Sequence, residues 1–128
     1  MLFMKKTGWK IEDINNVPPM KDTFSKGWKS IRWYMDITSF GVNGVTKPKG
    51  EWLTPVHDES DENQDELFIV FEGCAEFHLD DKKVKAPKGT LISVKPQVKR
   101  GAMALQTPTT ILIIGSPIGQ VYKPPSWA

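Results

Sequence analysis

The chain has 128 residues, a net charge of +2 and a hydrophobic content of 39%. This length is enough for one domain that buries its own core without disulfides or a structural metal. The longest apolar runs, residues 67–71 and 111–114, are far too short to cross a bilayer, so we expect no membrane partner. The single cysteine, Cys74, excludes an internal disulfide and fits a reducing cytoplasm, where we expect the protein to act.

The charges are unevenly distributed along the chain. Six of the 15 acidic residues lie between Asp58 and Glu66, so the rest of the chain is basic. The lysines are scattered singly or in pairs, and aromatic residues do not alternate with them as they would on a surface that stacks bases. We therefore expect no nucleic-acid partner.

The N-terminal third of the chain is the least regular in pattern. Residues 1–27 contain Pro18 and Pro19, which exclude a long helix, and we interpret them as an irregular arm with one short strand or helical turn. We expect the arm to pack its aromatic residues on the body of the protein. Residues 28–36 are rich in Trp, Tyr and Ile and predict a strand, and residues 37–45 predict a second one.

Short strands continue through the rest of the chain, separated by glycine or proline and without any helical period. We expect strands at residues 51–56, 66–72, 75–79, 84–86, 90–94, 100–105 and 109–115. This spacing is typical of an antiparallel sandwich or barrel. We therefore predict a single all-β domain, residues 1–128, with a barrel at residues 28–115 and a proline-rich tail at residues 116–128.

The segment at residues 66–73, Glu-Leu-Phe-Ile-Val-Phe-Glu-Gly, combines a buried strand with a charged residue at its start. Side chains in a strand repeat every two residues, so Glu66 shares a face with Phe68 and Val70. A carboxylate at the edge of an apolar interior is costly unless it has a partner. The candidate partners are the polar residues at 57–59 and Arg100.

Two segments resemble the motifs of the cupin superfamily. Glu66 and Gly73 match the Glu-X6-Gly half of its first motif, and residues 87–96, Pro-Lys-Gly-Thr-Leu-Ile-Ser-Val-Lys-Pro, resemble the glycine-to-proline half of its second. The likeness covers residues 51–115, and the chain is similar to a group of small single-domain bacterial cupins. It implies a jelly roll, the double-stranded β-helix barrel, whose open end holds a metal or a small ligand. It also favours a homodimer.

The resemblance raises the question of a metal, because cupins usually hold Fe, Mn, Ni or Zn with three histidines and a glutamate. His57 stands for the first histidine of the motif. The second falls on Glu59, or on Asp61 if the spacing is counted back from Glu66. A metal held by His57, Glu59 and Glu66 therefore stays an alternative, with Gln64 as a further side chain beside Glu66.

Arg100 stands where the second motif has its histidine. An arginine offers only donors and keeps its charge, so it cannot be a metal ligand, and the resemblance implies a degenerate metal site without a cofactor. Arg100 then either pairs with Glu66 in place of the metal or receives the carboxylate or phosphate of a ligand, with His57 alongside. The sequence leaves both interpretations open.

Two classes of function follow from these residues. The first is a non-catalytic cupin that binds or senses a small anionic molecule, with His57, Glu59, Gln64, Glu66 and Arg100 lining the pocket. The alternative is a metal-dependent enzyme, an oxygenase, isomerase or lyase acting on a small organic acid. A metal-free enzyme with Glu66 as general base is a third possibility. Whether the protein is an enzyme stays open, because one fold hosts many chemistries.

Overall fold

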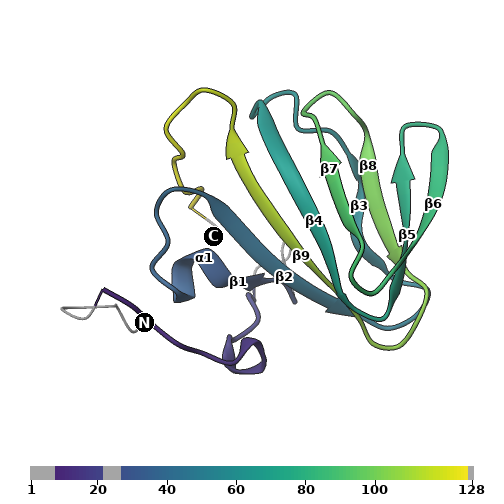
Figure 1. The fold of residues 1–128 in the computed structure, drawn as a ribbon, viewed down its shortest axis with the longest axis horizontal. Coiled ribbons are helices and arrows are strands. Elements are labelled where there is room, and N and C mark those ends of the chain that lie inside the picture. The colour runs from purple at the N-terminus through teal and green to yellow at the C-terminus, as the bar shows by residue number, and fades with distance from the viewer. Residues whose placement is uncertain (1–7, 22–26, 127–128) are drawn as a thin grey trace.

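The structure, a computed structural model, describes residues 8–21 and 27–126, and its strands form two antiparallel sheets (Figure 1). The elements in chain order are the 3-10 turn η1 Ile14–Asn16, strand β1 Lys29–Ser30, helix α1 Ile31–Tyr34, and strands β2 Gly41–Lys47, β3 Trp52–His57, β4 Gln64–Glu72, β5 Cys74–Leu79, β6 Lys82–Pro87, β7 Leu91–Val94, β8 Arg100–Ala104 and β9 Thr109–Pro117. Within the described ranges, no helix is long and apolar enough to span a membrane.

The two sheets have the layout of a jelly roll. One has the strand order β1-β2-β9-β4-β7, and the other has the order β3-β8-β5-β6. All the strand pairs are antiparallel, and β4 lies between β9 and β7. The prediction of an all-β jelly-roll barrel is therefore confirmed.

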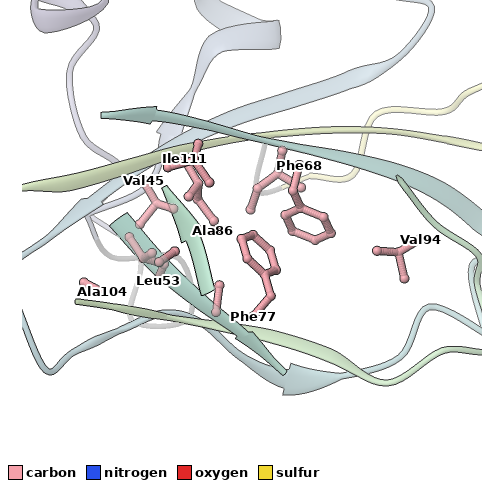
Figure 2. Close-up of a cluster of buried hydrophobic side chains, with 12 residues drawn as sticks. Val45, Leu53, Phe68, Phe77, Ala86, Val94, Ala104 and Ile111 are labelled. Atoms are coloured by element: carbon pink, nitrogen blue, oxygen red, sulfur yellow. The ribbon is translucent and has the colours of Figure 1, made fainter. Parts of the chain in front are cut away.

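The hydrophobic core lies between the inner faces of the two sheets (Figure 2). Phe68 of β4 and Phe77 of β5 meet across it edge to face, with ring centroids 5.3 Å apart, a favoured geometry for aromatic pairs. Phe68 and Val70 are both buried, and Glu66 has only 9% of its side chain exposed. The predicted shared face of these three residues is confirmed, and it places Glu66 at the edge of the core.

The predicted strand at residues 28–36 is wrong, because only Lys29–Ser30 is extended and a one-turn helix follows. The hydroxyl of Ser30 caps this helix by accepting the backbone N–H of Trp33 at 3.4 Å. Asp36 then adopts a φ of 59°, which ends the helix. The next strand consequently begins at Gly41 rather than at residue 37.

The N-terminal arm is irregular apart from η1. Trp9 is 63% exposed, whereas Val17 of the same arm is buried. Phe24, another aromatic residue of the arm, lies outside the described residues.

Candidate functional site

A cavity of about 850 Å³ lies between the two sheets. Its walls come from β2, β3, β4 and β9, from α1 and from the tail that follows β9. Its apolar lining consists mainly of Trp28, Trp52, Leu53, Phe68 and Ile113. Its polar lining consists of His57, Glu59, Glu62, Gln64 and Glu66, of Arg32, Lys47 and Lys123, and of Asn43, Thr54 and Tyr122. A concave, largely apolar site with a few converging polar groups is typical of small-molecule binding.

Three of the residues predicted from the sequence gather on one wall of this cavity. His57 ends β3, Glu59 follows it in the loop, and Glu66 faces inward from β4. One ligand atom from each lies within 4.8 Å of the others. Gln64 lies two residues before Glu66 on the same inner face and also lines the cavity.

The orientation of the His57 ring is fixed by its neighbours. Nδ1 lies 2.7 Å from the carbonyl oxygen of Pro55, and because that oxygen can only accept, Nδ1 carries a proton. Nε2 therefore faces the cluster, 3.1 Å from Glu59 Oε1. Two acceptors at this distance need a proton or a cation between them. The hydrogen bond to Glu59 accordingly raises the pKa of His57, against the effect of burial.

The carboxyl group of Glu66 has a raised pKa. Burial is the main cause that raises its pKa from 4.5 to about 7, and the charge of Glu59 adds to it. Arg100 and His57 act in the opposite direction. Glu66 therefore changes its charge near neutral pH, as a general acid or base must.

Arg100 is the partner that the buried carboxylate of Glu66 requires. Its Nη1 donates to Glu66 Oε1 at 2.7 Å, which confirms the ion pair predicted as one of the two alternatives. Its Nε donates to the carbonyl of Val98 at 2.8 Å, and its Nη2 donates to those of Lys95 and Pro96. The guanidinium is thus held by four acceptors within the protein.

Arg100 lies deeper than the residues that line the cavity. The side chain has 0% of its surface exposed and is not part of the lining, whereas its partner Glu66 is. A contact between Arg100 and a ligand stays a prediction.

The cations that do line the cavity were not predicted as site residues. Arg32 comes from α1, Lys47 from the end of β2 and Lys123 from the tail. Arg32 donates from Nη1 to the carbonyl of Ile37 at 3.0 Å, a contact that helps to hold the chain after the helix. Nothing in the local sequence around these residues marks them, because their places depend on how the helix and the tail fold onto the barrel.

The tail after β9 is part of the same cavity. It loops back toward α1 (Figure 1), and Tyr122 within it is buried. Burial raises the pKa of the Tyr122 hydroxyl, while the nearby charge of Arg32 lowers it. Tyr122 therefore keeps its proton at neutral pH and can donate it in a hydrogen bond.

The remaining candidates lie away from the cavity. His78 pairs with Glu76 at 2.9 Å and its ring meets Trp52 edge to face, so it is held in the sheet. Cys74 is buried and acts as a small hydrophobic residue.

Neither the known family models nor the curated proteins include a match to the sequence. Solved structures do match the fold. A cupin protein from Bacteroides fragilis has a TM-score of 0.70 at 16% identity, over 94% of this chain and 93% of that one. An RmlC-like cupin protein from Desulfovibrio desulfuricans has a TM-score of 0.56 at 25% identity, over 62% and 74% of the two chains.

A third similar structure is KdgF from Halomonas sp., with a TM-score of 0.57 at 21% identity, over 62% of this chain and 70% of that one. The similarity covers nearly the whole chain in the first case and 62% of it in the other two. By its fold, this chain is a member of the cupin superfamily.

Proposed function

We propose that the protein binds a small organic anion in the cavity between its sheets and acts as a binding or sensing module. The observation that carries this proposal is the cavity itself, which offers about 850 Å³ beside the cluster of His57, Glu59 and Glu66. Its volume lies within the range of about 300–1,000 Å³ that is usual for ligand sites.

The preference for an anion rests on the cations of the wall. Arg32, Lys47 and Lys123 all line the cavity, and all three are basic side chains. In a space enclosed by apolar side chains, such charges attract a carboxylate or phosphate more strongly than they would in water. These three residues take the place that the sequence had suggested for Arg100.

The ion pair of Arg100 and Glu66 favours ligand binding without a metal. Glu66 Oε1 already accepts from Arg100 at 2.7 Å, so one of its two oxygens is engaged. The permanent charge of the guanidinium also repels a second cation beside Glu66. A buried carboxylate with its own cation needs no metal to compensate it.

A divalent transition metal at His57, Glu59 and Glu66 is the second candidate, and one specific observation favours it. His57 donates through Nδ1 to the Pro55 carbonyl, so Nε2 is directed at the two carboxylates, as in histidines that bind metals. Two carboxylates and one imidazole suit Fe, Mn, Ni or Zn. Such an ion would polarise an oxygen of a bound organic acid, which is the chemistry of a metal-dependent cupin enzyme.

The binding proposal is tested by following backbone amide NMR signals while citrate is titrated into the protein. We expect saturable shifts at Asn43, Phe68 and Ile113, which line the cavity. A paired substitution, Lys47→Gln with Lys123→Gln, should weaken the binding. The matched control is Lys83→Gln with Lys85→Gln on β6, which lies outside the cavity lining. Shifts confined to exposed lysines, or equal effects of both pairs, would contradict the proposal.

The two candidates are separated by elemental analysis of protein purified without a histidine tag or chelator. Binding without a metal predicts far less than one metal ion per chain. It also predicts that Arg100→His gains metal, because the substitution removes the cation and adds a donor. A stoichiometric metal in the unmodified protein that is lost in Glu66→Gln would instead support the metal-dependent enzyme.

A further inference from the structure

The inner wall of the cavity contains a row of three paired residues, two of which are glycines. Gly41 of β2 pairs with Gly115 of β9, and Gly115 pairs with Glu66 of β4. Paired residues of neighbouring strands present their side chains on the same face, and Glu66 faces inward. The row from Gly41 to Glu66 therefore has no side chain of its own at two of its three positions.

The length of this row follows from the geometry of the sheet. Gly41 and Glu66 are separated by two strand spacings, which places their Cα atoms about 10 Å apart. Both glycines are crowded on the inner side. A Cβ at position 115 would lie 2.9 Å from Gln64 Oε1 and 3.3 Å from Glu66 Cγ. A side chain there would thus intrude on the space beside Glu66.

The opposite end of the row is occupied by Tyr122. A Cβ at position 41 would lie 2.9 Å from the Tyr122 hydroxyl, so the ring lies directly over Gly41. The hydroxyl makes no hydrogen bond within the described part of the chain. Arg32 is close enough to Tyr122 for its charge to act on the phenol. Polar groups therefore lie at both ends of the row. The Glu66 carboxylate and the Gln64 amide lie at one end, and the Tyr122 phenol and the Arg32 guanidinium lie at the other.

One polar atom beside this row lacks a partner. Asn43 lies two residues after Gly41 on the same face of β2 and lines the cavity. Its Oδ1 is buried, and no hydrogen bond reaches it from any residue that the structure describes. A buried acceptor without a donor costs on the order of 1–3 kcal/mol, and a hydroxyl of a bound molecule would relieve this cost.

From this arrangement we infer that Tyr122 and Gln64, which close over Gly41 and Gly115, mark the two ends of a binding slot for a hydroxylated organic anion. The anionic group lies against Tyr122 and Arg32, a hydroxyl donates to Asn43 Oδ1, and the other end of the molecule lies against Gln64 and Glu66. The inference rests on the proposed binding function and adds the orientation and chemical class of the ligand. Carboxylate and phosphate share the chemistry of the Tyr122 end.

The test uses three probes and the full-length protein: D-gluconate with a carboxylate, D-glucose 6-phosphate with a phosphate, and neutral D-glucose. Binding is followed by amide NMR, with Gly41 and Gly115 as reporters inside the slot. We expect at least one of the two anions to shift both glycine signals saturably and to bind more tightly than D-glucose. Whichever of the two anions binds more tightly shows whether the slot prefers a carboxylate or a phosphate.

Two substitutions test the slot. Tyr122→Phe keeps the ring and removes the hydroxyl. It should weaken the binding of the anion about three- to tenfold while leaving the binding of D-glucose unchanged. Gly115→Ala should abolish saturable binding. The matched control is Gly44→Ala, which points to the outer face of β2, where the added Cβ would meet the side chain of Ile31 at 3.2 Å. It should leave binding unchanged, and the thermal unfolding of each variant verifies its fold.

The outcomes separate this inference from the proposed function. Probe-induced shifts at Phe68 and Ile113 that are insensitive to Tyr122→Phe and Gly115→Ala would overturn the slot and leave the cavity as the binding site. Equal affinity for D-glucose and both anions would overturn the anionic assignment. If neither anion shifts any cavity residue at millimolar concentration, the slot is wrong for this class of ligand, and the citrate titration decides separately on the cavity.

Discussion

Replacing Arg100 by alanine tests the ion pair at the edge of the core. The substitution leaves the Glu66 carboxylate, 9% exposed, without its cation and removes the donors of the Val98, Lys95 and Pro96 carbonyls. Removing one partner of a buried pair costs about 3–5 kcal/mol. At this chain length that loss lowers the melting temperature by roughly 10–20 °C. The assay is urea unfolding together with a thermal scan of both proteins.

The pH dependence of this loss adds a second check. Above the Glu66 pKa of about 7 the carboxylate is ionised, so losing Arg100 should cost more there than in mild acid, where Glu66 binds a proton instead. Lys99→Ala, at the neighbouring exposed position, is the matched control and should change stability by less than about 0.5 kcal/mol. A loss below about 1 kcal/mol for Arg100→Ala at every pH would show that the ion pair with Glu66 does not stabilise the fold.

Three further predictions concern stability. Because the folded pKa of Glu66 is raised from 4.5 to about 7, the unfolding free energy should fall as pH rises through this interval, by up to about 3 kcal/mol. The pKa of His57 is raised from 6.5, so its contribution to the fall comes above pH 6.5. Glu66→Gln should flatten the titration curve, and a rise in stability over the interval would contradict the sign. Gly89→Ala should cost about 1–2 kcal/mol for its φ of 90°. Gly73→Ala should cost clearly more in the same urea assay, because its Cβ would lie 2.5 Å from the Pro108 carbonyl oxygen; equal costs would argue against that close approach. Phe77→Ala, at a fully buried position, should lose about 3–5 kcal/mol, whereas the partly exposed Val84→Ala should lose much less; similar losses would contradict the assigned core.

The barrel strands were predictable because their sequence pattern reflects local physics. Alternating polarity and the glycines and prolines between strands determine where each strand lies and which face is buried. The pairing of Glu66 with Arg100 was predictable for a similar reason, since an inward carboxylate in an apolar strand requires a cation. The helix Ile31–Tyr34 was not, because β-favouring residues fill it and only the Ser30 cap and the turn at Asp36 mark it.

The wall of the cavity was only half predictable. His57, Glu59, Gln64 and Glu66 lie within ten residues of one another, next to a recognisable strand, so the local pattern identifies them. Arg32 and Tyr122 come from a helix and a tail at opposite ends of the chain. Their meeting depends on tertiary packing, which no local pattern encodes. The depth of Arg100 likewise depends on loop carbonyls that fold around it.

We propose above all that the cavity binds a small organic anion without a metal. The most direct measurement is the citrate titration by amide NMR on protein stripped with a chelator and verified to be metal-free by elemental analysis. We expect saturable shifts at Asn43, Phe68 and Ile113, with an affinity that added Zn²⁺ or Mn²⁺ leaves unchanged. Binding that appears only after metal is added, and disappears in Glu66→Gln, would contradict the claim and assign the site to a metal-dependent cupin.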